Sequence, residues 1–148
     1  MEGIHFKIGS WKELQHDCER VRGMVFVAEQ GFSHEEEFDD LDAVATHFVA
    51  VDKRSMVLGC ARLLDDGKIG RVAVLRPFRK RGVGHAIMEE VLRVAKEKGM
   101  PSVYLGAQVQ AMPFYEKLGF KAEGEEYDEG GIPHFQMATS VEVGVRRN

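Results

Sequence analysis

Residues 79–84 read RKRGVG and place three cationic side chains directly before two glycines one residue apart. The segment follows the strand-like run GRVAVL and precedes a strongly amphipathic stretch. The first turn of a helix has unpaired backbone N–H groups and a partial positive charge, and both favour an anion. Glycine leaves the backbone uncovered, while Arg79, Lys80 and Arg81 add charges that suit phosphate oxygens. We therefore expect a pyrophosphate site, with a tight surface turn as the alternative.

Two common nucleotide-binding motifs do not fit this junction. A dinucleotide-binding GxGxxG motif needs a third glycine, and position 87 is Ile. A P-loop needs Gly-Lys followed by Ser or Thr, and the chain has no such triplet. The loop therefore does not predict a nicotinamide dinucleotide or a nucleoside triphosphate.

The composition is typical of one globular domain, residues 1–148. Hydrophobic residues make up 44% and charged residues 30%, and the net charge of −4 argues against nucleic acid as a partner. No apolar run approaches the roughly 18 to 20 residues that span a bilayer, and the N-terminus does not resemble a signal peptide. Cys18 and Cys60 are expected to be free thiols, and no histidine has metal-ligand spacing. We therefore expect a cytoplasmic protein with neither metal nor membrane contact.

Periodicity and turn signals predict the elements around the loop. The predicted helices are 11–26, 83–98 and 112–119, and the predicted strands are 4–8, 46–52, 56–64, 68–75, 102–107, 120–128 and 134–140. The three strands between 46 and 75 should form an antiparallel meander. The acidic segment 29–45 is expected to be a loop with one helical turn, either solvated or attracting a cationic substrate. This order describes an α/β fold with a mixed sheet.

Two blocks of the chain resemble one enzyme family. VAVLRPFRKRGVGHAIMEEVLRVAKEKG resembles the acetyl-CoA signature of the GNAT superfamily of N-acetyltransferases, and AQVQAMPFYEKLGF is similar to the later part of that fold. VFVAEQGFSHEEEFDDLD and GGIPHFQM look like its small bacterial branch called ElaA-like or YjcF-like. The resemblance covers essentially the whole chain. It implies an acyl-CoA N-acyltransferase fold, with a mixed central β-sheet of about six to seven strands flanked by about four helices.

The resemblance also implies how acetyl-CoA is held. Backbone amides of the glycine loop hold the pyrophosphate, and the strand before it pairs with the pantetheine arm. An amide near Val74 polarises the thioester carbonyl. Gln108 stands where the family often has Asn. The implied cofactor-binding residues are Val72, Ala73, Val74, Arg79, Lys80, Arg81, Gly82, Val83, Gly84, His85, Gln108, Phe114 and Tyr115.

Tyr115 and His134 are the candidate catalytic residues. Tyr115 matches the family tyrosine near the cofactor sulfur, and a phenol with an unperturbed pKa of about 10 can protonate a departing thiolate. Core packing beside Phe114 is the alternative role. His134 follows a Gly-Gly-Ile-Pro loop, where some small-molecule members of the superfamily have a catalytic histidine. A histidine, with an unperturbed pKa of about 6.5, suits deprotonation of an amine, and capping of the strand is the alternative.

Arg71, Glu29 and His134 are the candidate substrate-binding residues. Arg71 adjoins the pantetheine strand and is a candidate to bind a substrate carboxylate, with an exposed strand position as the alternative. Glu29 stands at the end of the first predicted helix, where it either lines the acceptor pocket or lies on the surface.

The function expected from these residues is acetyl transfer from acetyl-CoA to a primary amine. A small molecule is the favoured source of this amine. Transfer is direct within a ternary complex, because Cys60 lies in a strand with no evident base beside it and does not fit a covalent acyl-enzyme. A non-catalytic acyl-CoA sensor or interaction module is the alternative. A homodimer is compatible with this description.

Overall fold

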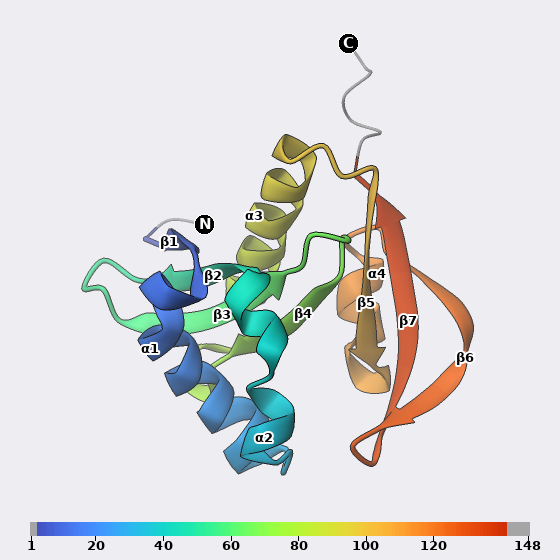
Figure 1. Cartoon of the computed structure of the whole chain (residues 1–148), viewed down its shortest axis with the longest axis horizontal. Helices are drawn as coiled ribbons and strands as arrows, with labels where there is room; N and C mark the ends of the chain where they lie inside the picture. Colours follow the sequence, from blue (N-terminus) through green and yellow to red (C-terminus); the bar gives the residue numbers. More distant parts are fainter. Residues whose placement is uncertain (1–2, 142–148) are drawn as a thin grey trace.

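The strands of the protein form two sheets that meet edge to edge. They are β1 (His5–Gly9), β2 (Thr46–Val51), β3 (Val57–Leu63), β4 (Ile69–Val74), β5 (Ser102–Gln108), β6 (Lys121–Glu129) and β7 (Ile132–Ser140). The computed structural model describes residues 3–141, in which the sheets have the orders β1-β2-β3-β4 and β5-β7-β6 (Figure 1). Pairing inside each sheet is antiparallel, whereas a bridge from Lys68 to Tyr104 joins the sheets in parallel. The expected α/β architecture and the meander of β2, β3 and β4 are confirmed.

Helices pack around the first sheet and beside the second. Among the described residues the α-helices are α1 (Trp11–Arg22), α2 (His34–Glu37), α3 (Val83–Glu97) and α4 (Met112–Glu116). A π-helix, η1 (Gly23–Glu29), follows α1, and three 3-10 turns are η2 (Asp40–Val44), η3 (Arg76–Phe78) and η4 (Val109–Ala111). At the start of α1, the Glu13 N–H donates to the Ser10 side chain at 3.3 Å and the Ser10 N–H donates to the Glu13 carboxylate at 2.8 Å. This reciprocal capping box fixes where the helix begins.

The first sheet has a hydrophobic core on each face. Side chains alternate along a strand, so Phe48 and Ala50 of β2 pack into the core that includes α3, while Val49 and Val51 pack into the core that includes α1. The core on the α3 face continues into β5 and β7. It therefore joins the two sheets and fixes where β4 and β5 lie relative to each other.

The first helix is shorter than the predicted 11–26. Gly23 and the β-branched Val25 and Val27 are weak α-helix formers, and here the backbone widens into the π turn. The Gln30 N–H donates to the Val25 carbonyl, five residues back, at 3.1 Å. π turns are often found at functional sites, and this one ends beside the pocket described below.

The acidic segment 29–45 has the one predicted α-helical turn, α2, and its Glu35, Glu36 and Asp40 are exposed, but it is not solvated throughout. It contains α2 and η2, and two of its carboxylates, Glu37 and Asp42, are only 4% and 3% exposed. Both are paired with buried arginines. Neither Glu37 nor Asp42 is therefore available to attract a cationic substrate from solution.

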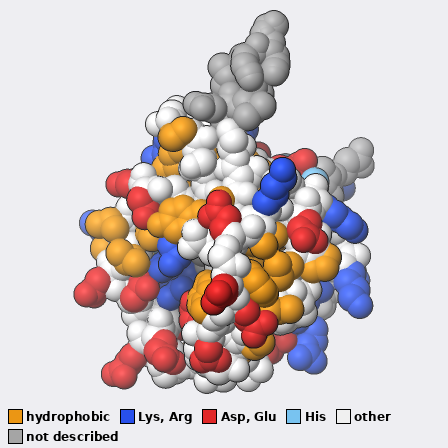
Figure 2. Space-filling model, turned by 90° about the vertical axis from the view of Figure 1, so that its right-hand side faces the viewer, with side chains coloured by type: hydrophobic (Ala, Val, Ile, Leu, Met, Phe, Trp, Pro, Cys, Tyr) orange, Lys and Arg blue, Asp and Glu red, His pale blue; other side chains and the backbone are white. Residues whose placement is uncertain are grey.

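Acidic side chains are spread over the side of the molecule that β6 and β7 form (Figure 2). β6 is exposed along its whole length, and its acidic residues are Glu123, Glu125, Glu126, Asp128 and Glu129.

Within residues 3–141, no helix is both long and apolar enough to cross a membrane.

Candidate active site

A pocket of about 360 Å³ lies where β4 and β5 separate. The Leu75 N–H donates to the Leu58 carbonyl in β3, and backbone groups alternate along a strand, so those of Val74 point away from β3. The Val74 carbonyl accordingly accepts a hydrogen bond from Arg79 Nε, at 2.8 Å, and not from a neighbouring strand. The edge of β4 that faces the gap can therefore pair with an extended ligand.

The structure brings some of the predicted site residues together and leaves others outside. The pocket wall includes Arg71, Val72, Ala73, Val74, Arg79, Gln108, Tyr115 and His134. The predicted residues outside this wall are Glu29, Lys80, Arg81, Gly82, Val83, Gly84, His85 and Phe114. Both candidate catalytic side chains thus line the same pocket, although they come from different elements, α4 and β7.

His134 presents one ring nitrogen to the pocket. Its Nδ1 lies 2.7 Å from the carbonyl oxygen of Ile132, and a carbonyl can only accept, so Nδ1 carries the proton. In the neutral imidazole, the lone pair is therefore on Nε2. The imidazole is stacked on the Tyr127 ring, with centroids 5.6 Å apart and an interplanar angle of 29°. Because Gly106 has no Cβ, the Tyr127 hydroxyl can lie directly over β5, which holds this stack in place.

Tyr115 is both a core residue and a pocket residue. It is 9% exposed and packs edge-on against Phe114 and Phe120, with centroids 5.0 and 5.9 Å away. Burial raises the pKa of its phenol to about 12, so the hydroxyl stays protonated. Within residues 3–141 this hydroxyl has no protein hydrogen-bond partner. A buried donor without a partner in a pocket wall is available to a ligand.

The glycine loop has the backbone expected of an anion site. Gly82 precedes α3 in the left-handed region, with φ of 85°, and no side chain caps the first N–H groups of this helix. The Arg79 side chain does not point to the start of α3, because its guanidinium donates hydrogen bonds to the Val74 carbonyl and the Glu29 carboxylate. The backbone N–H of Arg79 donates to the Arg76 carbonyl at 3.2 Å. The cationic side chains that remain next to Gly82 are those of Lys80 and Arg81.

A largely buried arginine–carboxylate network lies behind the part of the pocket wall that includes Arg71. It consists of Arg22, Arg62 and Arg71 together with Glu37, Asp39 and Asp42. Three of its ion pairs are Arg22–Asp42 at 2.8 Å, Arg62–Asp39 at 2.7 Å and Arg71–Glu37 at 2.9 Å. Burial raises the pKa of the Glu37 carboxyl, which the charges of Arg71 and Arg22 oppose. The network ties α1, α2 and η2 to β3 and β4.

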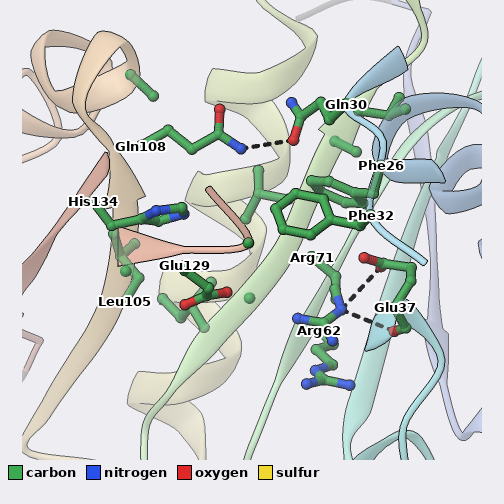
Figure 3. Close-up of a pocket in the computed structure, with 18 of the residues that line it drawn as sticks. Phe26, Gln30, Phe32, Glu37, Arg62, Arg71, Leu105, Gln108, Glu129 and His134 are labelled. Carbon is green, nitrogen blue, oxygen red and sulfur yellow. Dashed lines mark hydrogen bonds and ion pairs between the residues drawn. The ribbon is translucent and has the colours of Figure 1, made fainter. Parts of the chain in front are cut away.

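Arg71 lies in a β-bulge of β4. Cys60 of β3 faces Ala73 and Arg62 faces Gly70, so two residues of β4 oppose a single residue of β3. The bulge places Arg71 in the left-handed region, with φ of 54°, and its side chain in the pocket wall. Its guanidinium is held by the carboxylate and carbonyl oxygens of Glu37 (Figure 3). It is thus neither an exposed strand residue nor a fully unpaired charge.

Several pocket residues had no clear signal in the sequence. Phe26 and Phe32 line the pocket from η1 and the segment after it, and Glu129 lies across the pocket from Arg71 (Figure 3). Phe32 contacts the position that a Cβ of Gly130 would occupy, so it closes against the turn between β6 and β7. In the sequence, Phe26 falls at the end of the predicted helix 11–26 and Phe32 falls in the acidic segment 29–45, so neither position indicated a role in the pocket.

Comparison with known proteins identifies the class. The model of a protein family described as "Acetyltransferase (GNAT) domain" matches residues 15–141 of this chain. The uncharacterized N-acetyltransferase YjcF of Bacillus subtilis is 40% identical over 129 residues, which cover 85% of this chain and 92% of that protein. The chain therefore belongs to the GNAT family of acetyltransferases, which transfer acyl groups from coenzyme A.

Two solved structures are also similar to the chain over most of its length. Escherichia coli ElaA is 30% identical, with a TM-score of 0.81 over 91% of this chain and 98% of that one. An acyl-CoA N-acyltransferase from Pseudomonas aeruginosa is 32% identical, with a TM-score of 0.80 and the same coverage. Within the family, the protein is of the ElaA- and YjcF-like branch.

The described residues fit an acyl-coenzyme A. The free edge of β4 suits the amide-bearing pantetheine arm, the uncapped start of α3 suits a pyrophosphate, and the Tyr115 hydroxyl is a donor without a protein partner. Over residues 3–141, no group of three or more His, Cys, Asp or Glu side chains is placed to hold a metal ion.

Proposed function

We propose that this protein is an N-acetyltransferase that moves the acetyl group of acetyl-CoA directly to a primary amine of a small molecule, within a ternary complex. The observation that carries the proposal is the presence, in one pocket, of a proton acceptor and a proton donor. The acceptor is His134 Nε2 and the donor is the Tyr115 hydroxyl. Acetyl-CoA supplies the acyl group as a thioester.

Each residue has one task in this reaction. His134 Nε2 takes the proton that the amine nitrogen loses as it bonds to the acyl carbon. The Val74 amide, on the free edge of β4, donates to the oxygen on which negative charge develops. Tyr115 gives its proton to the sulfur as the carbon–sulfur bond breaks, and its raised pKa keeps that proton available. The amine nitrogen ends acylated and the sulfur ends as a thiol. His134 then carries one extra proton and Tyr115 lacks one, and transfer of a proton from His134 to the Tyr115 phenolate through solvent restores both residues and closes the balance.

A panel of amines tests the proposal. Thiol release from acetyl-CoA should depend on one or more members of a set of polyamines, amino acids, aminoglycosides and peptide N-termini. His134→Gln should remove the acidic limb of the pH profile of kcat/KM, because an imidazole must be neutral to accept a proton. The exposed His16 of α1 provides the control His16→Gln, which should keep the wild-type profile. Binding of acetyl-CoA without turnover would instead support the sensor alternative.

We further propose that Arg71 binds a carboxylate of the acceptor. Its Nε and Nη2 are held by Glu36, Glu37 and Asp39, and within the described residues its Nη1 has no partner. Burial lowers the pKa of Arg71, but a guanidinium remains charged at neutral pH. Nη1 is thus a fixed donor in the pocket wall.

Paired acceptors test this role. An α-amino acid and the amine that lacks only its carboxylate should differ in KM for the wild type, with the amino acid favoured. Arg71→Gln should lose that difference and Arg71→Lys should retain part of it. Equal KM values for both acceptors in the wild type would exclude the role.

The proposal includes a cytoplasmic location and a homodimer. Cys18 and Cys60 are both buried and free, which suits a reducing compartment. Cell fractionation tests the location. Light scattering tests the oligomeric state, and a monomer at working concentration would remove the homodimer.

A further inference from the structure

Two adjacent residues at the end of η1 are attached to opposite sides of the gap between β4 and β5. Glu29 holds Arg79 with two bonds, Nη2 to Oε1 at 2.7 Å and Nη1 to Oε2 at 3.1 Å. Gln30 Oε1 accepts from Gln108 Nε2, at 2.7 Å, across the pocket (Figure 3). Residues 29–30 thus form a strap from the β4 side of the gap to the end of β5.

Arg79 is committed to this strap. Nη1 and Nη2 both donate to Glu29, and Nε donates to the Val74 carbonyl, so all three guanidinium nitrogens have partners. The hydrogen bond from Arg79 lowers the pKa of the Glu29 carboxyl, which stays ionised and balances the charge of Arg79. An arginine in this state adds little positive charge to the phosphate site.

Gln108 is held in the same way. Its Nε2 donates to Gln30, and its Oε1 accepts from Gln110 Nε2 at 2.6 Å. The amide orientation is therefore fixed at both ends. The predicted contact of Gln108 with pantetheine would require one of these bonds to be replaced.

The strap fixes the pocket wall that η1 and the segment after it form, where the acceptor is proposed to bind. Val25 and Phe26 of η1 line the pocket just before the strap, and Phe32 lines it just after. The two links hold the end of η1, and with it these side chains, against the gap in which the cofactor arm is proposed to lie. A shift of about 1 Å in such positioning groups can slow a reaction by 10²-fold.

We infer that Glu29, Gln30 and Arg79 are positioning residues, and that Arg79 acts through Glu29 and not on the cofactor phosphates. The inference rests on the proposed function, since it names what places the acceptor against the acyl group. The pyrophosphate charge then falls to Lys80, Arg81 and the start of α3. Within residues 3–141 neither of these two cations has an ion-pair partner, in contrast to Arg79.

Three charge-removing variants separate the two roles of the loop. Glu29→Gln and Arg79→Gln should each lower kcat/KM for the acceptor by about tenfold or more and leave the calorimetric Kd for acetyl-CoA within about twofold. Lys80→Gln should instead weaken acetyl-CoA binding and leave kcat/KM for the acceptor, measured at saturating acetyl-CoA, nearly unchanged. Glu19→Gln is the matched control, because within residues 3–141 the Glu19 carboxylate accepts a hydrogen bond from Gln15 alone, and this variant should match the wild type in both measurements.

A double variant and hydrogen exchange complete the test. The loss in Glu29→Gln/Arg79→Gln should be smaller than the product of the two single losses, because each variant already breaks the shared Glu29–Arg79 link. Each residue also has a contact of its own, Glu29 with Arg76 Nη2 at 3.1 Å and Arg79 with the Val74 carbonyl. Amides of residues 23–30 should exchange faster in Glu29→Gln than in the wild type, a readout that needs no turnover. A large loss of acetyl-CoA affinity in Arg79→Gln, with unchanged exchange in Glu29→Gln, would overturn the inference. Failure of the wild type to turn over any amine would overturn the proposed function alone.

Discussion

Arg22 holds Asp42 in a bidentate ion pair that is almost fully buried. Nη1 to Oδ1 is 2.8 Å and Nη2 to Oδ2 is 3.0 Å, while the side chains are 1% and 4% exposed. The guanidinium also lies over the rings of Trp11 and Phe38. A pair of this kind couples the end of α1 to the acidic segment, which carries one wall of the pocket.

Loss of this arginine should therefore destabilise the fold. Arg22→Met leaves Glu37 and Asp42 buried without it, and we expect a loss of about 3–5 kcal/mol in the free energy of unfolding. Urea denaturation measures the change. Lys7→Met removes the exposed Lys7–Asp17 pair, 3.2 Å long, and should cost no more than about 1 kcal/mol. Similar losses in the two variants would show that burial of the network does not matter.

Asp39 should make stability depend on acid pH. Burial alone would raise the pKa of its carboxyl, but the hydrogen bonds and charge of Arg62 outweigh burial and lower it. The contribution of Asp39 to the free energy of unfolding is therefore fully present above its unfolded-state pKa of about 3.9. It is lost as the pH falls through the lower pKa of the folded state.

The variant Asp39→Asn tests this sign. At pH 7 it should be less stable than the wild type by about 1–3 kcal/mol, and the difference should shrink below about pH 4. Thermal unfolding at several pH values checks this. The exposed neighbour Asp40 gives the control Asp40→Asn, and a difference between wild type and Asp39→Asn that is constant with pH would refute the assignment.

Tyr115→Phe should lower kcat by about 10²-fold with little change in acetyl-CoA affinity, since it removes a proton donor and keeps the ring packing. Because the pKa of Tyr115 is about 12, deprotonation of this residue should cause no alkaline loss of kcat below about pH 10. Stopped assays from pH 6 to 10 measure both effects. An unchanged kcat would leave Tyr115 with a packing role alone.

The sequence predicted the fold and the pocket strands well because these depend on local patterns. Periodicity located α3 and the meander, and the glycines marked the loop before α3. It could not predict that Glu37 and Asp42 are buried, because burial of a carboxylate depends on Arg22 and Arg71, which are distant in the chain. For the same reason the position of Arg79 beside the loop glycines suggested a phosphate contact and could not reveal that Glu29, 50 residues away, holds its side chain.

The two loop glycines should respond differently to alanine. Gly82 has φ of 85°, where a Cβ costs about 1–2 kcal/mol, so Gly82→Ala should lower both stability and acetyl-CoA affinity. A Cβ on Gly84 would lie 3.4 Å from Phe114 Cζ, an ordinary contact, so Gly84→Ala should be nearly neutral. Gly84→Val should displace Phe114. Calorimetry and thermal melts compare the three, and equal effects of both alanines would contradict the loop geometry.

Initial rates with acetyl-CoA and the acceptor varied together test the central claim, direct transfer in the β4–β5 pocket. The substrate identified from the amine panel should give double-reciprocal lines that intersect, because both substrates are bound before the acyl group moves. His134→Gln should lower these rates without changing the pattern. Parallel lines would indicate an acyl-enzyme and would contradict direct transfer, and no amine-dependent thiol release from any member of the panel would contradict catalysis itself.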